Sequence, residues 1–189
     1  MPAEFLKHPS PSPERCASCD SDRCNNLSSL NEFYGKTLGS YIIRLTIRSS
    51  CMVVKDIQAA EKFFREVVGV PNFVKMENLR AEELEGTYYG RPATNSFHLY
   101  MAASGESLIE LIQPVSGQSI FDDYLKKHPE GGVQHIAYIV PEAELDKAIS
   151  ELTNKGYPVI TSLRLPVAKV AFFDTYKEIG VVTEFNWCN

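Results

Sequence analysis

The sequence predicts an α+β domain in which two βαβββ modules, at about residues 42–115 and 130–189, form one pseudo-twofold unit. The first observation is that a strand-like segment, an amphipathic helix and further strand-like segments occur in this order twice. The second is that each helix ends at a Gly-x-Pro sequence, GVP at Gly69 and GYP at Gly156. Because a half-covered sheet must bury its other apolar face, two such modules are expected to pack together.

The first module begins with residues 42–54, whose β-branched residues are typical of a strand. Asp56 then suits the N-cap of a helix, and Gly69 with Pro71 predicts its end. Apolar residues recur between these points at the spacing of one helical face. They are Ala60, Phe63, Phe64, Val67 and Val68. Strands are predicted after the helix at residues 73–76, 87–89, 96–102 and 107–113.

The second module repeats this order. Residues 133–140 read as a strand, and strands are also predicted at 159–163, 167–174 and 181–186. The helix between them has Leu145, Ala148, Ile149 and Leu152 on one face and ends at Gly156 and Pro158. The segment FDDYLKKHPE, which joins the modules, predicts a short solvated helix.

The chain divides into a flexible N-terminal tail, residues 1–38, and a domain at residues 39–189. PSPSPER and the Ser- and Asn-rich segment after it carry too little periodic apolar surface to offset the entropy of ordering. Cys16, Cys19 and Cys24 allow two interpretations: a zinc knuckle with His8 as fourth ligand, or a leader that contains three thiols. No second C-x-x-C or paired histidine follows, which favours the leader.

Composition restricts the class of partner. The net charge of −5 disfavours a nucleic-acid binder, because such proteins usually carry a basic surplus. No apolar run reaches the length of a membrane span or of a secretory signal. Five cysteines, an odd number, fit a reducing compartment. We therefore expect a cytoplasmic protein whose partner is a small molecule, with no role for nucleic acid or membrane.

Three ionisable residues lie in mid-strand among apolar neighbours: Glu110 in LIELIQP, His135 in GGVQHIAYIV and Glu184 in GVVTEFNW. A carboxylate there is costly to bury unless it is paired, protonated or metal-bound. Two carboxylates and an imidazole make a ligand set for a divalent ion. Each residue could instead point to a solvated face of its strand. The equivalent placement of Glu110 and Glu184 on the last strand of each module favours the metal site.

The segments SSCMVVKDIQAAEKFFREVVGV, IELIQP, GGVQHIAYIV and FFDTYKEIGVVTEF resemble the vicinal-oxygen-chelate superfamily (glyoxalases, bleomycin resistance proteins and extradiol dioxygenases) over about residues 42–188. The chain is most similar to its methylmalonyl-CoA epimerase and glyoxalase-like members. The resemblance implies two cupped modules around a divalent ion (Zn, Ni, Co, Mn or Mg), held by two residues of the opening strands and two of the closing strands. Carried over, these residues include His135, Glu110 and Glu184.

The fourth ligand position departs from the family. Counted back from Asp56, the residue at the place of the family's His or Gln is Ser49, or Ser50 if the register shifts by one, so neither alignment supplies an imidazole. A serine hydroxyl is a poor ligand for Zn or Ni. Either water completes a three-ligand site or the metal has been lost. Ser49 also weakens the extradiol dioxygenase interpretation, which requires two His and one Glu.

The resemblance implies a metal-assisted isomerase, epimerase or lyase that acts through an enolate on a small carbonyl substrate. Glu110 or Glu184 would serve as the catalytic base. One alternative is a metal-free cup that sequesters a small molecule, as resistance proteins do. Another is a metal-free acid/base enzyme that uses His135 with the two carboxylates. The modules could pair within one chain or across a homodimer.

Further residues are candidates for substrate binding. Lys169 and Arg44 could pair with a carboxylate or phosphate, although such side chains are usually only solvated. Ser49 lines the expected site, and Cys51 is expected to be a small buried residue rather than a nucleophile. The aromatic side chains could form a wall for a flat substrate, or could be core. They are Tyr88, Tyr89, His98, Tyr100 and Phe172.

Overall fold

The computed structural model describes residues 45–165 and 168–188. The predicted tail, the cysteines within it and Arg44 lie outside these ranges. Within these ranges, ten strands form one sheet. The strands are β1 Thr46–Val53, β2 Val74–Arg80, β3 Thr87–Tyr88, β4 Arg91–Pro92, β5 Ser96–Ser104, β6 Ser107–Ser116, β7 Gly132–Ile139, β8 Val159–Leu165, β9 Ala168–Phe173 and β10 Val182–Cys188.

The helical segments are α2 Ile57–Phe63 with its π-helical continuation η2 Phe64–Val68, the 3-10 turn η3 Ala81–Leu84, α3 Ile120–Lys127, α4 Glu142–Asn154 and α5 Tyr176–Ile179. Three of them, α2, α3 and α4, agree in place with the two predicted amphipathic helices and the predicted connecting helix, whereas η3 and α5 were not predicted. Along the part of the chain that the structure covers, no helix combines the length and hydropathy that a membrane span needs.

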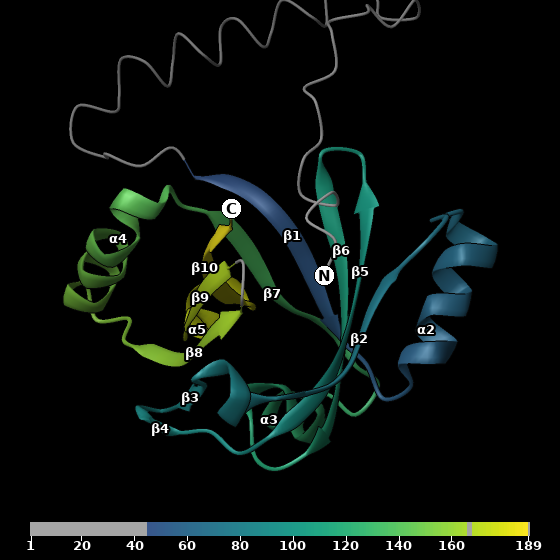
Figure 1. Ribbon diagram of the computed structural model, residues 1–189, viewed down its shortest axis with the longest axis horizontal. Helices are drawn as coiled ribbons and strands as arrows, with labels where there is room; N and C mark the ends of the chain where they lie inside the picture. Colours follow the sequence, from purple (N-terminus) through teal and green to yellow (C-terminus); the bar gives the residue numbers. More distant parts are fainter. Residues whose placement is uncertain (1–44, 166–167, 189) are drawn as a thin grey trace, which may run out of the picture. The chain divides into compact units, whose positions relative to one another are not determined.

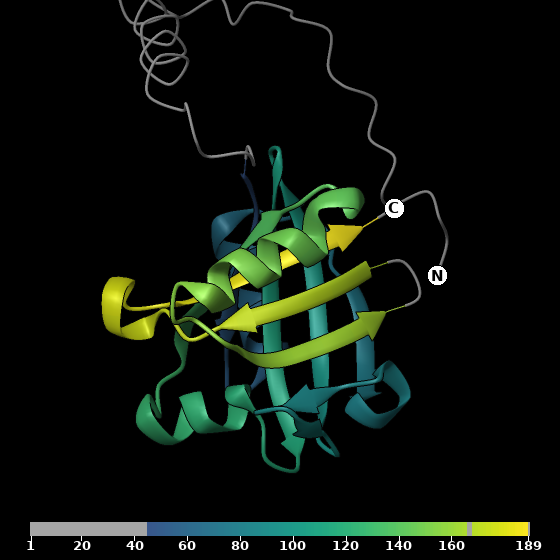
Figure 2. The same cartoon turned by 90° about the vertical axis from the view of Figure 1, so that its left-hand side faces the viewer.

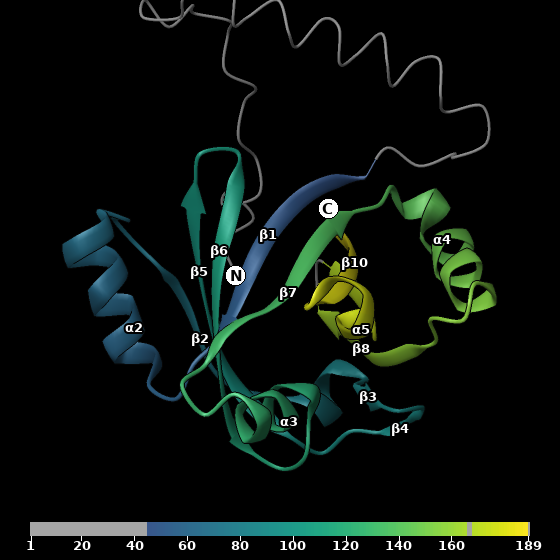
Figure 3. The ribbon, with the colours of Figure 1, turned by 180° about the vertical axis from the view of Figure 1, so that it is seen from behind.

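The order of the strands confirms the predicted duplication. It runs β2-β5-β6-β1 through the first module and β7-β10-β9-β8 through the second, and β1 pairs with β7 where the halves meet. In each half the opening strand runs parallel to the closing strand, β1 beside β6 and β7 beside β10. Figure 1 and Figure 3 show β1 and β7 side by side, with α2 and α4 on opposite outer faces. The two modules therefore pair within one chain.

A hairpin of the first module extends the sheet of the second. Strands β3 and β4 are joined by Tyr89 and Gly90, both with positive φ, which is typical of a two-residue hairpin turn. Strand β3 pairs with β8, and the Thr87 hydroxyl lies 2.8 Å from the Ser162 hydroxyl. In Figure 2 this hairpin lies beside the strands of the second module, and α4 crosses their outer face. The hairpin thus joins the second module at the edge away from β1.

Helix α2 begins and ends as predicted, but its apolar residues are not one buried face. The Asp56 carboxylate accepts hydrogen bonds from the amides of Gln58 and Ala59, and Gly69 ends the segment in the left-handed conformation. Phe63 and Val67 are nevertheless largely exposed, as is Val68. For Val67 and Val68 the cause is the change to a π-helix at residue 64, because i→i+5 hydrogen bonding alters the angle at which later side chains leave the axis.

The connecting helix α3 corrects a second expectation. It was predicted to be solvated, and its last turn does carry Lys126 and Lys127. However, Ile120 and Phe121 are buried in the main apolar core, which both modules line. The composition of the FDDYLKK segment is polar, but the apolar pair at its start fills the space between the two halves of the sheet.

Candidate metal centre

Four adjacent strands place the predicted ligands on one face of the sheet. On β1, Ser49 and Cys51 are buried whereas Ser50 is exposed, the alternation expected of a strand with one covered face. Cys51 lies opposite Glu110 of β6 on one side and opposite His135 of β7 on the other. Glu184 of β10 lies one strand beyond β7, opposite Ala137. We call Glu110, His135 and Glu184 the acid–histidine cluster.

The sheet register identifies the residue that takes the place of His135 in the first module. His135 lies opposite Val182, two residues before Glu184. Ser49 lies opposite Leu108, two residues before Glu110. Under the pseudo-twofold relation, Ser49 is therefore the counterpart of His135, and Cys51 is the counterpart of Ala137. The fourth inward position thus carries the serine that the resemblance indicated.

The imidazole of His135 is held in one tautomer. Its Nδ1 atom lies 2.6 Å from the amide oxygen Oε1 of Gln134. Because Oε1 only accepts, Nδ1 donates the hydrogen bond, and in the neutral imidazole Nε2 then carries the lone pair. Nε2 lies 2.9 Å from Oε2 of Glu184, yet the angles are not those of a hydrogen bond and Nε2 has no partner. Two acceptors at this distance repel each other unless a cation or a proton lies beside both.

Burial and mutual repulsion act on the acidic groups. Burial, followed by the charge of Glu184, raises the pKa of Glu110, whereas His135 and the nearby Ser49 oppose the rise. The pKa of the Cys51 thiol is raised well above its usual value by burial, then by Glu110 and Glu184. The Ser49 hydroxyl lies near Glu110 but has no hydrogen-bond partner of acceptable geometry. The negative charges of Glu110 and Glu184 are therefore not fully neutralised by the side chains around them.

Glu184 is oriented from a second side. The Asn186 side-chain amide donates to Oε1 of Glu184 at 3.2 Å, which leaves Oε2 directed toward His135. Aromatic rings enclose the histidine: the ring centroids of Phe172 and Phe121 lie 5.0 and 6.3 Å from that of His135. His135 is 0% exposed and Glu184 is 4% exposed. Water has little access, so electrostatic interactions within the cluster are strong.

The residues predicted to bind substrate are dispersed. Phe172 lies beside the cluster, and Ser49 faces it. Tyr100 packs instead on the α2 side of the sheet with Ile57 and donates a hydrogen bond to Glu77 at 2.7 Å. Lys169 does not reach the cluster: its ammonium lies 2.8 Å from Asp146 on α4.

The remaining members of the predicted aromatic wall do not form one surface. Tyr88 packs against the main core and donates a hydrogen bond to Asp123. Tyr89 is exposed at the hairpin turn, and His98 accepts a hydrogen bond from the Asn78 amide. Tyr88 and Tyr100 therefore fit the expectation that these aromatic residues belong to the core better than the expectation that they form a continuous wall for a substrate.

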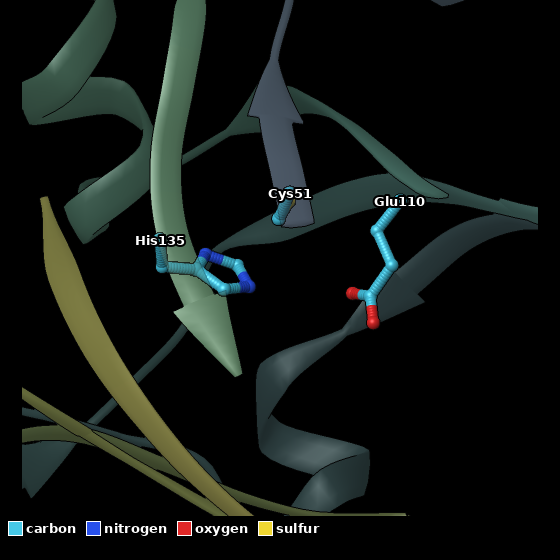
Figure 4. A group of neighbouring side chains, drawn as sticks. All are labelled: Cys51, Glu110 and His135. Atoms are coloured by element: carbon cyan, nitrogen blue, oxygen red, sulfur yellow. The ribbon is translucent and has the colours of Figure 1, made fainter. Parts of the chain in front are cut away.

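Two residues of the site were missed as functional candidates. Cys51 was expected to be only a small buried residue, but its sulfur lies within 4.8 Å of ligand atoms of Glu110 and His135, and those two ligand atoms lie equally close to each other. Figure 4 shows the three side chains together, with Cys51 on β1 between its two neighbours. Gln134 was not singled out. The i, i+2 spacing of Ser49 and Cys51 was the available signal for Cys51, because alternate strand residues share a face.

Two surface hollows lie elsewhere. One, of about 330 Å³, is lined by polar residues that include Asp56, Glu77 and Gln113. The other, of about 450 Å³, is lined by residues that include Tyr89 and Asp174. Neither lining contains a member of the acid–histidine cluster, which is buried away from both hollows.

The paired βαβββ modules, with buried ligand-type residues on their opening and closing strands, define a class of proteins whose sites lie inside a curled sheet. The chain belongs to the glyoxalase/bleomycin resistance protein/dioxygenase superfamily, whose family model matches residues 50–172. This confirms the superfamily that the sequence motifs resemble. No curated protein is similar enough in sequence to match the chain.

Solved structures support the same fold. A hypothetical protein of Bacillus halodurans C-125 is 23% identical, with a TM-score of 0.59, and the match covers 77% of this chain and 95% of that chain. A Streptomyces coelicolor methylmalonyl-CoA epimerase variant in complex with 2-nitronate-propionyl-CoA is 24% identical, with a TM-score of 0.56, covering 77% and 96%. Methylmalonyl-CoA epimerase from Mycobacterium tuberculosis is 16% identical, with a TM-score of 0.54, covering 76% and 87%.

Proposed function

We propose that the chain is a metal-dependent epimerase or isomerase of a small carbonyl compound, of which an acyl thioester is the first candidate. The observation that carries this proposal is the approach of His135 Nε2 to Glu184 Oε2 at 2.9 Å without a hydrogen bond. A divalent cation would satisfy both acceptors, and Glu110 on the neighbouring side would complete a three-residue ligand set. The residues present therefore fit a metal.

The protein's own groups would prepare the site. Gln134 fixes the imidazole tautomer that leaves Nε2 free to bind, and Asn186 orients the Glu184 carboxylate. The rings of Phe121 and Phe172 limit the entry of water beside His135. When bound, a divalent ion supplies a Lewis acid that draws negative charge onto a substrate carbonyl oxygen.

A carboxylate of the cluster would transfer the proton next to the substrate carbonyl. Glu110 is the first candidate if it leaves the metal during turnover, because burial and the charge of Glu184 raise the pKa of its released carboxyl and a more basic carboxylate removes a weakly acidic proton more readily. Glu184 is the second candidate if it leaves the metal during turnover. Removal of the proton from one face of the carbon and its return to the other inverts the centre, which is an epimerisation.

The comparisons support the class of reaction rather than the substrate. The matched family model covers most of the domain, and several of the similar structures are methylmalonyl-CoA epimerases. All of these are less than 25% identical to the chain, so the thioester is a proposal that follows from the site chemistry and the fold together. A lyase reaction through the same type of intermediate, a homodimer and a cytoplasmic location stay predictions.

One observation favours a second function. Ser49 at the fourth position is a weak ligand, and apolar side chains surround the cluster, as a metal-free cup that binds a small apolar molecule would require. Metal-free acid/base catalysis by His135 with Glu110 and Glu184 is a related alternative. Both alternatives predict a protein that acts without a divalent ion.

The first test is the metal content of the purified full-length protein and of His135→Ala and Glu184→Ala. We expect near-stoichiometric divalent metal in the unaltered protein and little in either variant. His128→Ala and Glu106→Gln are matched controls, because Glu106 is exposed in the turn between β5 and β6 and the His128 side chain contacts Tyr176, and both variants should keep the metal. Absence of metal after incubation with Zn, Co, Ni, Mn or Mg would contradict the proposal and favour the binding cup.

The second test measures exchange of the substrate proton. Incubation of the metal-loaded protein with 2-methyl-branched acyl thioesters in D₂O should introduce deuterium at the carbon next to the carbonyl, detected by mass spectrometry. Glu110→Gln, compared with the unaltered protein at equal bound metal, should slow this exchange by about 10²–10⁴-fold if Glu110 is the base. No exchange with any thioester, despite bound metal, would leave the metal site standing but remove thioesters as the substrate class.

A further inference from the structure

The first module has no imidazole at the position equivalent to His135, but it has the thiol of Cys51 close to that position. Ser49, the counterpart of His135, carries only a short hydroxyl with no hydrogen-bond partner. Two residues further along the same face of β1 lies Cys51, whose counterpart in the second module is Ala137. The first module therefore carries a metal-binding atom, the Cys51 sulfur, two residues beyond the position that the pseudo-twofold relation assigns to a ligand.

The sheet register holds Cys51 between two members of the acid–histidine cluster. Cys51 is the direct partner of Glu110 across the parallel β1–β6 pair and of His135 across the antiparallel β1–β7 pair. Its sulfur, one Glu110 oxygen and one His135 nitrogen all lie within 4.8 Å of one another. At a tetrahedral ion with bonds of about 2.0–2.3 Å, the ligand atoms lie about 3.3–3.8 Å apart, so side-chain rotations that move these atoms by up to about 1 Å would bring all three to one ion.

The unpartnered atoms nearby point to a ligand independently of the thiol. His135 Nε2 is completely buried, has no hydrogen-bond partner and faces a carboxylate oxygen at 2.9 Å. A buried nitrogen acceptor of this kind is rare in a protein interior unless an ion or a proton occupies the space beside it. The sulfur of Cys51 lies within 4.8 Å of one His135 nitrogen.

We propose that Cys51 is the fourth protein ligand of the metal, bound through Sγ as a thiolate together with Glu110, His135 and Glu184. This inference rests on the proposed metal site. Formation of the sulfur–metal bond replaces the S–H bond, and the proton leaves to solvent. Because thiolate is a soft ligand, the site selects Zn²⁺ over Mg²⁺ and Mn²⁺, and Co²⁺ can replace Zn²⁺ as a spectroscopic probe.

The negative charge of such a site has a positively charged residue, Arg48, close to it in the chain. Two carboxylates and one thiolate around a divalent ion leave one net negative charge. Arg48, a half-buried residue of β1, already acts on Glu110 through its positive charge. The guanidinium next to Ser49 in the chain therefore offsets the charge that the additional anionic ligand introduces.

The experiment uses full-length protein in which Cys16, Cys19, Cys24 and Cys188 are replaced by Ala, so that Cys51 is its one thiol. Addition of Co²⁺ to the metal-free form should produce a sulfur-to-cobalt charge-transfer band in the near ultraviolet. The band should disappear in Cys51→Ala and Cys51→Ser, and it should persist in Ser49→Ala. Cobalt content is measured in parallel for every variant.

The outcomes distinguish failure of the Cys51 assignment from failure of the proposed metal site. Stoichiometric Co²⁺ without a charge-transfer band would overturn the assignment of Cys51 while leaving the proposed metal site intact. Failure of the four-alanine protein to bind Co²⁺, when it also fails to bind Zn²⁺, would overturn both. A band that survives in Cys51→Ser would likewise overturn the inference. That variant contains no thiol, so the band could not come from a bond between cobalt and the Cys51 sulfur.

A second measurement does not depend on how the Cys51 variants fold. X-ray absorption at the zinc edge of the four-alanine protein should show one sulfur neighbour at about 2.3 Å among nitrogen and oxygen neighbours. A coordination shell of nitrogen and oxygen alone would overturn the inference. In competition experiments the protein should bind Zn²⁺ more tightly than Mn²⁺, and Cys51→Ser should reduce that preference by about tenfold or more.

Discussion

His135 Nε2 and Glu184 Oε2 lie 2.9 Å apart without forming a hydrogen bond, although both atoms are buried. The Gln134 amide oxygen produces this relationship, because it accepts a hydrogen bond from Nδ1–H and leaves Nε2 of the neutral imidazole as an acceptor. An acceptor that faces a carboxylate is stable only when a positive charge lies beside both. The predictions below test how the surrounding residues maintain this pair and the fold that positions it.

Gln134→Leu should weaken metal binding by about 10–100-fold, because the histidine loses the partner that fixes its tautomer and orientation. The measurement is competition for Zn²⁺ against a chromogenic chelator. Gln118→Leu is the matched control, since Gln118 is exposed and donates to Tyr88 rather than to the histidine. Equal affinities for the two variants would show that Gln134 does not orient the ligand.

Metal-free protein should lose stability as the pH rises above about 4.5, the ordinary pKa of a glutamate, because folding raises the pKa of Glu110. The folded state favours the neutral carboxyl, so its contribution is fully present below the unfolded pKa and is lost as the pH passes the raised value. The free energy of unfolding, measured in urea between pH 4 and 8, reports this loss.

Glu110→Gln supplies the control for that pH dependence, because glutamine stays neutral throughout the range. The variant should show a flatter stability curve than the unaltered protein, whereas Glu106→Gln, at an exposed position, should not. Saturation with Zn²⁺ should reverse the trend in the unaltered protein, since the ion favours the ionised carboxylate. Parallel curves for Glu110→Gln and Glu106→Gln would contradict the shift.

Phe121→Ala should lower the free energy of unfolding by about 3–5 kcal/mol, the usual effect of removing a buried aromatic ring. Phe121 is 2% exposed and contacts the rings of Phe97 and Phe172. Phe63→Ala is the matched control, because Phe63 is 53% exposed on α2. Similar losses in the two variants would contradict the central place of Phe121 in the core.

Gly131→Ala should destabilise the protein more than Gly105→Ala, by about 1–3 kcal/mol. Both glycines have positive φ, so both variants carry backbone strain. A Cβ at Gly131 would meet the Val53 carbonyl oxygen at 2.6 Å, whereas a Cβ at Gly105 would meet open space. The difference between the two losses of unfolding free energy, measured by chemical denaturation, therefore reports the close contact between Gly131, just before β7, and the Val53 carbonyl at the end of β1. Equal losses would show that this approach is relaxed in solution.

The sequence predicted much of the fold because its signals are local. The β-branched stretches lie at the observed strands, and Asp56 and Gly69 begin and end the first helical segment as expected. The repeat of this order predicted the pseudo-twofold sheet that the strand pairing confirms. Where a local change intervened, the prediction was wrong: the π-helical turn after Phe63 exposes Val67, which the 3.6-residue spacing had placed with the other apolar residues.

The sequence by itself determined that Glu110, His135 and Glu184 lie in mid-strand, because strand periodicity and the duplication can be read along the chain. Only the tertiary structure decided which strands are neighbours, since the β1–β6 and β1–β7 pairs join segments far apart in the sequence. That pairing places Cys51 beside Glu110 and His135. It also directs Tyr100 toward α2 and Lys169 toward Asp146, away from the acid–histidine cluster. Alternation along a strand shows which residues share a face, but packing between distant segments decides which face encloses the site.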